Sequence, residues 1–238
     1  LCIVTPGEAE ATRFAGDLNA LGIPTAVFPA RDYVLRPIEG TAREYEYRRL
    51  SVLGDIVGGR LQAVCVPDEG LTQYTTPRAE FCNNTRTLHP GDTVPRTELT
   101  ALLYNAGYAR RAQVDGPGQF SIRGDIVDLY APDMKLPVRM EFWGDEIDTM
   151  HTFDLATQRR EDPIEKIYVS PAREVLFGSP AEAAELLRAF IKKFRGKKRT
   201  ALEACLATEL AQLDGGALPV NMDKYLAVRY PQPATLLD

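Results

Sequence analysis

Hydrophobic and polar positions follow two different patterns over the first part of the chain. Short apolar runs over Leu1–Thr5, Thr25–Phe28 and Leu61–Val66 predict three strands. Between these runs, apolar residues recur at helical spacing over Glu8–Leu21 and over Thr41–Gly58, which predicts two helices. Strands that alternate with helices are typical of a parallel sheet covered by helices.

The pattern changes near Arg86, where polar residues, proline and glycine accumulate, and we place a domain boundary there. A helix is predicted over Thr97–Ala106, with its leucines inward. Gly144-Asp145 lies between two strand-like runs and predicts a hairpin turn. Residues rich in β-branched and aromatic side chains predict strands over Gln119–Tyr130, Pro137–Asp154 and Ile164–Val169.

From about Ser179 the chain is predicted to be helical. Ser179 can cap a helix whose first turn contains Pro180. A second helix is predicted over Thr200–Leu213, because Gly215-Gly216 would end it. The buried stripe of the first helix is expected to comprise Leu186, Leu187, Phe190 and Ile191. These patterns together predict an α/β protein with a domain boundary near Arg86 and a helical region from about Ser179.

Composition narrows the class of protein. The 238 residues are 45% hydrophobic, which is ordinary for a globular chain, and no apolar run approaches the ~20 residues of a membrane helix. The chain opens without Met, without a signal peptide and inside a predicted strand, so we expect a cytoplasmic protein and a piece of a longer one. Its formal charge of −5 argues against autonomous DNA binding, because phosphate neutralisation needs cations.

Motifs for catalysis are missing from the sequence. There is no GxxxxGK[ST] loop to surround phosphates and no GxSxG nucleophile elbow. Gly116-Pro117-Gly118 has no lysine after it and precedes a predicted strand. The four cysteines are widely spaced without CxxC, which argues against a zinc site, and His89 and His151 are expected to be structural or surface residues. We therefore predict no catalytic residue, no metal and no cofactor in this chain.

One strongly basic run has two interpretations. Lys192, Lys193, Arg195, Lys197, Lys198 and Arg199 fall within eight residues. They can contact nucleic-acid phosphates, or they can form a solvated turn between helices, which is what most charge runs do.

A predicted strand carries a second candidate surface. Successive side chains of a strand point to opposite faces, so Val138, Met140 and Phe142 would face the core. Arg139, Glu141 and Trp143, the only tryptophan, would then face outward. On the preceding strand Ser121, Arg123 and Asp125 are placed opposite Phe120, Ile122 and Ile126, so that pairing of the two strands would put Arg123 and Arg139 on one surface. Arginine and aromatic residues are enriched at protein interfaces, although a solvated sheet face is the alternative.

Three stretches carry a family resemblance. GQFSIRGDIVDLY (118–130), LPVRMEFWGDEID (136–148) and TFDLATQR (152–159) resemble the UvrA-binding domain shared by UvrB and Mfd, the bacterial transcription-repair coupling factor. Phe28–Asp32 and the helix around Arg48-Arg49-Leu50 resemble the degenerate nucleotide-binding half of Mfd. Mfd fits better than UvrB, because the short connection after Phe28-Pro29 leaves no room for the damage-probing hairpin of UvrB.

This resemblance implies both a fold and a role. The fold would be a partial, degenerate RecA-like parallel sheet at 1–86, an inserted β-rich UvrA-binding domain at 87–174 and a small, mostly helical domain at 175–238. The chain would dock UvrA through Arg123 and Arg139, which match the family's contacting arginines, and through Trp143, where relatives usually have Phe; Glu141 is added from the strand pattern. ATP, Mg²⁺, RNA polymerase and double-stranded DNA would be bound by other parts of the parent chain.

Two alternatives remain open from the sequence. The chain could be a fragment of a UvrB-type ATP-dependent helicase that verifies damage. It could instead be a scaffold for the motor domains of its parent, in which case the isolated chain would not bind UvrA. The resemblance further implies that another domain of the parent can mask the docking surface.

Overall fold

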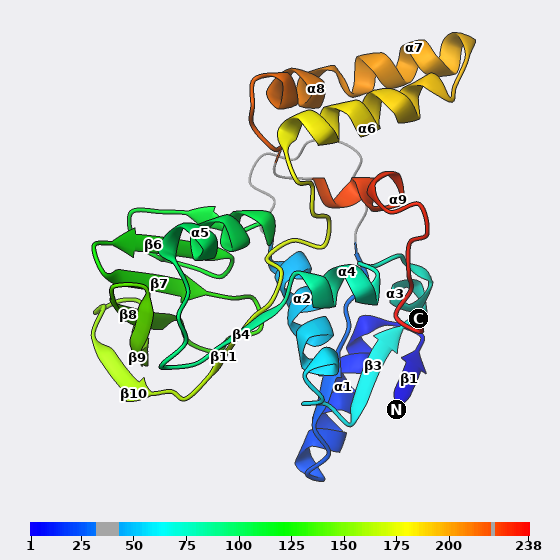
Figure 1. Ribbon diagram of the computed structural model, residues 1–238. Helices are drawn as coiled ribbons and strands as arrows, with labels where there is room; N and C mark the ends of the chain where they lie inside the picture. The colour runs from blue at the N-terminus through cyan, green and yellow to red at the C-terminus, as the bar shows by residue number, and fades with distance from the viewer. Residues whose placement is uncertain (32–42, 220–221) are drawn as a thin grey trace.

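The computed structural model describes residues 1–31, 43–219 and 222–238 and has a mixed α/β architecture. Its described residues form three sheets, of three, six and two strands. Figure 1 shows the small parallel sheet and the six-stranded sheet side by side, with a layer of helices above them. No helix in the described part of the chain is long and apolar enough to cross a membrane.

The N-terminal sheet is parallel, as the alternation of strands and helices predicts. Its strands β1 (Cys2–Thr5), β2 (Thr25–Val27) and β3 (Ala63–Pro67) lie in the order β1-β3-β2. The middle strand β3 is buried at every position, which explains its unbroken apolar sequence. The helices are α1 (Glu8–Ala20) and α2 (Glu44–Val57); the predicted start of α2 lies outside the described residues.

A pair of strands forms the base of the middle segment, residues 87–174. After the short helices α3 (Asp68–Thr72) and α4 (Arg78–Asn83), strand β4 (Arg86–Leu88) leads into this segment. Strand β11 (Ile167–Val169) leads out of it and pairs antiparallel with β4. The chain therefore enters and leaves the middle segment at one place (Figure 1).

Six strands in the order β10-β9-β8-β7-β6-β5 make up the sheet of the middle segment. Helix α5 (Arg96–Asn105) packs against its inner face, where Leu99 and Leu103 join a core with Met140 and Phe142. The apolar side of the predicted strand alternation is thus confirmed. The strands are β5 (Ala109–Arg110), β6 (Gln119–Arg123), β7 (Ile126–Tyr130), β8 (Val138–Trp143), β9 (Glu146–Phe153) and β10 (Arg160–Pro163).

Two predictions about this sheet are wrong. The single strand-like stretch 119–130 is a hairpin, because Gly124 adopts a φ of 60° and turns the chain between β6 and β7. The turn places Ile126 opposite Arg123, so Ile126 lies on the outward face and not on the face of Phe120. In addition, the strands of Arg123 and Arg139 do not pair, because β7 lies between them.

The C-terminal segment, residues 175–238, is helical and has a core of its own. The Ser179 hydroxyl accepts a hydrogen bond from the Glu182 backbone N–H at 3.1 Å, which confirms the predicted cap. The predicted second helix is in fact two helices: it starts earlier, at Gly196, and is interrupted at Leu206. The elements are α6 (Pro180–Lys192), α7 (Gly196–Cys205), α8 (Ala207–Asp214), the 3₁₀ helix η1 (Met222–Tyr225) and α9 (Leu226–Arg229).

A buried ionic cluster joins the three segments. Glu174, fully buried just after β11, accepts a hydrogen bond from Arg49 Nε at 2.7 Å and forms an ion pair with Arg31. Arg31 Nη1 also lies 3.2 Å from the Asp223 carboxylate. The Glu174 carboxylate of the middle segment thus binds two arginines of the N-terminal segment. One of them, Arg31, also contacts the C-terminal segment.

The core clusters follow the same division along the chain. One cluster lies within residues 88–172 and a second within 175–230, while the clusters around the parallel sheet draw on residues 3–71 and on Leu236, which returns from the C-terminus. The three domain limits remain a prediction.

Candidate protein-docking site

The outward face of the six-stranded sheet presents two rows of side chains across β6, β7, β8 and β9. In the first row Asp128 lies opposite Ser121 on one side and Arg139 on the other. In the second row Ile126 lies opposite Arg123 and Glu141. Arg123 and Arg139 therefore share one surface, as predicted, although they reach it from strands separated by β7.

Asp128 brings the two arginines together. Its carboxylate is fully buried. One oxygen accepts a hydrogen bond from Arg139 Nε at 2.6 Å, and the other accepts from Arg139 Nη2 at 2.9 Å and also from Arg123 Nη2. This fork geometry is the strong form of the arginine–carboxylate interaction. One buried negative charge thus fixes two positive ones at the surface.

The Arg139 side chain is mostly buried and contacts protein groups besides Asp128. Only 12% of its side chain is exposed, its guanidinium lies 4.7 Å above the Phe153 ring, and Nη1 donates to the Gln158 carbonyl at 3.2 Å. The hydrogen bond to Asp128 raises the pKa of Arg139, so it stays charged. This arginine is better placed to organise the surface than to reach a partner.

Arg123 is the more accessible of the two. Its side chain is 44% exposed, although one Nη donates to Asp128. A guanidinium has five N–H donors in a fixed plane. The hydrogen bond to the buried carboxylate restrains a partly exposed guanidinium that has further donors for a partner.

Glu141 lies on the predicted face but is already paired. Its carboxylate forms an ion pair with Arg160 on β10 and accepts a hydrogen bond from the Thr149 hydroxyl at 3.3 Å. Only 24% of its side chain is exposed. It therefore has less to offer a partner than Arg123.

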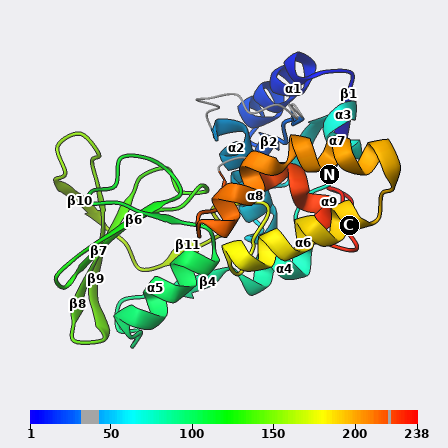
Figure 2. The same cartoon turned by 90° about the horizontal axis from the view of Figure 1, so that it is seen from above.

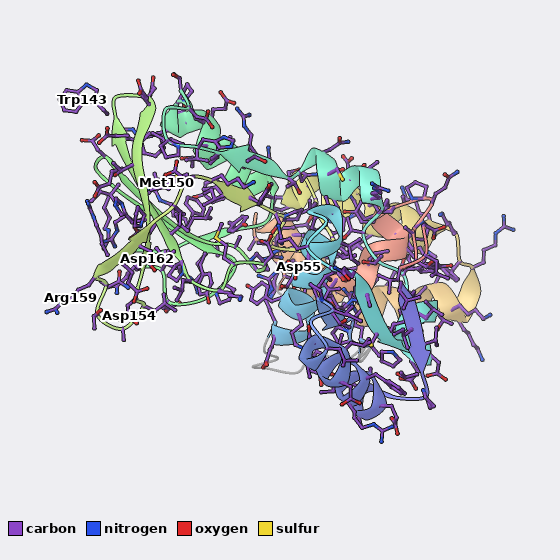
Figure 3. The ribbon with its side chains drawn as sticks, turned by 90° about the horizontal axis from the view of Figure 1, so that it is seen from below. Asp55, Trp143, Met150, Asp154, Arg159 and Asp162 are labelled. Atoms are coloured by element: carbon purple, nitrogen blue, oxygen red, sulfur yellow. The ribbon has the colours of Figure 1, made fainter. Side chains whose placement is uncertain are left out.

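Trp143 projects from the tip of the β8–β9 hairpin. It is 82% exposed, and Figure 3 shows its ring pointing away from the molecule. The turn that carries it depends on Gly144, whose φ of 65° confirms the predicted hairpin. The same sheet thus carries an exposed indole at its hairpin tip and oriented arginines on its outward face, and protein interfaces are enriched in both side-chain types.

The residues that support Arg139 were not predicted as site residues. They are Asp128, Phe153 and Gln158, of which Gln158 adopts a φ of 58° in the β9–β10 turn. Asp154 and Arg159, labelled at the other end of the sheet in Figure 3, belong to the same turn. A lone carboxylate within the apolar strand Ile126–Tyr130 was the available signal, since buried charges are paired.

The predicted basic run lies elsewhere in the molecule. It occupies the last residue of α6, the connection after it and the first turn of α7. Figures 1 and 2 both place the α6–α7 connection at the end of the molecule opposite the six-stranded sheet. The two candidate sites are therefore separate surfaces.

Comparisons with known proteins confirm the resemblance seen in the sequence. Residues 87–175 match the family model described as the UvrB interaction domain. The chain is 26% identical over 245 residues to the transcription-repair-coupling factor of Bacillus subtilis, covering 99% of this chain and 21% of that protein. It is 28% identical over 239 residues to the factor of Haemophilus influenzae, covering 99% of this chain and 20% of that protein.

A third relative matches a shorter stretch. The transcription-repair-coupling factor of Staphylococcus aureus is 30% identical over 149 residues, which cover 63% of this chain and 13% of that protein. The chain thus spans about a fifth of the length of the two relatives that it matches from end to end.

Proposed function

We propose that this chain is the non-catalytic UvrA-docking region of a transcription-repair coupling factor. In this role it would recruit UvrA to lesions where RNA polymerase has stalled, in nucleotide excision repair. The match of residues 87–175 to the UvrB interaction domain supports a docking function for the middle segment. Contacts with RNA polymerase and DNA, and use of ATP and Mg²⁺ by motor domains, are proposed for other parts of the longer protein.

The arginine pair on Asp128, on the same sheet as the exposed Trp143, is the observation that carries this proposal. Arg123 would donate to a carboxylate of UvrA, with Asp128 and Arg139 holding it in place. Trp143 would enter an apolar depression on the partner, since it has no cover on this chain. The ordering cost of binding is low, because the arginines are already fixed.

Isothermal titration of UvrA into the chain tests the proposal. We expect Arg123→Ala and Trp143→Ala each to weaken binding at least tenfold, because central arginine and aromatic residues typically contribute ~2 kcal/mol or more and about 1.4 kcal/mol is a factor of ten. Tyr74→Ala, which truncates another exposed aromatic residue, is the matched control and should bind normally.

Arg139→Ala tests whether Arg139 stabilises the docking surface or contacts UvrA directly. The variant leaves Asp128 with Arg123 alone, so we expect weaker binding together with a lower free energy of unfolding. In contrast, Trp143→Ala should leave stability nearly unchanged. Arg123→Ala should lower stability less than Arg139→Ala does, because Arg139 still donates two hydrogen bonds to Asp128. If the intact chain does not bind UvrA, the docking role is wrong and the scaffold alternative is favoured. ATP hydrolysis by the chain would instead favour the UvrB-type helicase.

A further inference from the structure

Positive charge is concentrated at the α6–α7 connection. Residues 192–199 contain six of the 28 lysine and arginine residues and none of the 33 acidic ones. The rest of the chain therefore has 22 cations against 33 carboxylates. A protein with a net charge of −5 thus has one locally cationic end. We call Lys192, Lys193, Arg195, Lys197, Lys198 and Arg199 the basic tip.

The basic tip is exposed and almost without counter-ions. All six of its side chains belong to exposed residues. Within the described part of the chain, one ion pair involves it, Arg199 with Glu203 at 2.8 Å. Helix α7, which carries three of the six cations, contains no buried residue. These charges therefore do not serve the packing of the chain.

The cations of the basic tip lie where their mutual repulsion is unfavourable for the helix. Lys197, Lys198 and Arg199 lie in the first turn of α7, where the helix dipole already contributes partial positive charge and favours anions. No acidic residue lies in that turn, and no side chain caps it. Like charges near a helix N-terminus repel one another and the helix end, and a bound polyanion would relieve both repulsions.

From these observations we infer that the basic tip binds the phosphate backbone of double-stranded nucleic acid, without reading its sequence. Four of its six cations are lysines, which are depleted in protein interfaces but suited to phosphates as point charges. Its one aromatic residue, Phe194, is half-buried and packs edge-on against Phe190 at 5.2 Å, so it offers no stacking platform for single strands. The tip also lacks the apolar face that a membrane surface requires.

This inference does not rest on the proposed docking function. The tip lies at the opposite end of the molecule from the six-stranded sheet (Figures 1 and 2). A duplex held there would leave the docking face open, so the chain could bind a protein partner and a duplex at the same time.

Fluorescence anisotropy with a short labelled DNA duplex of arbitrary sequence tests the inference. The tip variant combines Lys192→Gln, Lys193→Gln, Lys197→Gln and Lys198→Gln. We expect at least tenfold weaker binding at low salt, and a salt dependence of log K that flattens by about one unit per lysine that contacts a phosphate. A control variant with the same change of charge combines Arg13→Gln, Arg110→Gln, Lys135→Gln and Lys166→Gln, all at exposed positions.

Each outcome decides for or against the inference. Binding that is lost in the tip variant and kept in the control supports it. Equal loss in both variants, or no binding by the intact chain, overturns it. If polyglutamate of similar charge displaces the duplex with equal affinity, the tip is a site for acidic proteins and the nucleic-acid assignment is wrong. Circular dichroism verifies that the tip variant is folded. Unchanged UvrA binding by this variant would show that the DNA result is independent of the docking proposal.

Discussion

At the scale of single residues, Asp128 determines how the outward face of the sheet is organised. It is a fully buried carboxylate in an otherwise apolar strand, and both arginines of the candidate site donate to it. Burying a charge is costly unless it is paired and hydrogen-bonded. Arg123 and Arg139 satisfy that requirement, and their hydrogen bonds to Asp128 fix the positions of their guanidinium groups.

Asp128→Asn tests this interdependence. The amide keeps the shape of the side chain but loses its charge and one acceptor, so Arg139 loses part of its pairing. We expect the free energy of unfolding to fall by about 1–3 kcal/mol. Urea denaturation followed by circular dichroism measures it. Asp148→Asn, at an exposed position on β9, is the control and should unfold like the wild type; equal stability of Asp128→Asn would contradict the role of this carboxylate.

The sequence predicted the outward-facing residues of the site on β8 better than the buried carboxylate on β7. Arg139, Glu141 and Trp143 follow from strand alternation, and the structure places them on the outward face. Asp128 was missed because its partners, Arg123 and Arg139, are close only after β6, β7 and β8 have paired. Local pattern shows which way a side chain points, whereas an ion pair across strands depends on register. Contact of any of these residues with UvrA stays a prediction.

At the scale of elements, the sequence predicted the longer helices and strands, but it missed one chain reversal and one helix interruption within them. The stretch 119–130 has strand character throughout, and only Gly124-Asp125 indicates the turn that divides it. The predicted helix over 200–213 is interrupted at Leu206, whose burial at the junction of α7 and α8 comes from tertiary packing. Residues 32–42, which include the predicted start of α2 at Thr41, lie outside the described residues.

Helix α6 offers a test of an element that was predicted from its cap. Ser179→Ala removes the acceptor for the Glu182 N–H, so we expect a loss of about 1 kcal/mol in stability. Ser179→Asp keeps an acceptor at the same place and should retain most of the wild-type stability. Thermal unfolding by circular dichroism compares the three proteins. If the alanine and aspartate variants melt together below the wild type, the cap is not the cause.

At the scale of the whole molecule, Glu174 connects segments that each have their own core. Arg49 and Arg31 reach it from the N-terminal segment, and Arg31 also contacts Asp223 of the C-terminal segment. The backbone N–H of Glu174 donates to Glu46 at 3.0 Å, and its carbonyl accepts from Thr76 at 2.5 Å. We interpret this cluster as the reason why the segments hold a defined arrangement.

Glu174→Gln should weaken the contacts between the three segments more than it destabilises the hydrophobic core of any one segment. Removing one partner of a buried ionic cluster typically costs 3–5 kcal/mol, roughly, because the remaining charges stay buried. We expect differential scanning calorimetry to show a lower transition that broadens or splits as segments unfold separately. Glu185→Gln, at an exposed position on α6, is the control. A single transition at the wild-type temperature would show that the cluster does not couple the segments.

The antiparallel pairing of β4 with β11 has a consequence for the ancestry of such chains. The middle segment begins and ends on neighbouring strands, so its two junctions lie side by side. A segment attached in this way can be exchanged as a unit, because a replacement of any length leaves the flanking ends where they were. The middle segment can therefore be transferred between larger chains as one unit, and a graft at β4 and β11 is where its transfer would be expected to succeed.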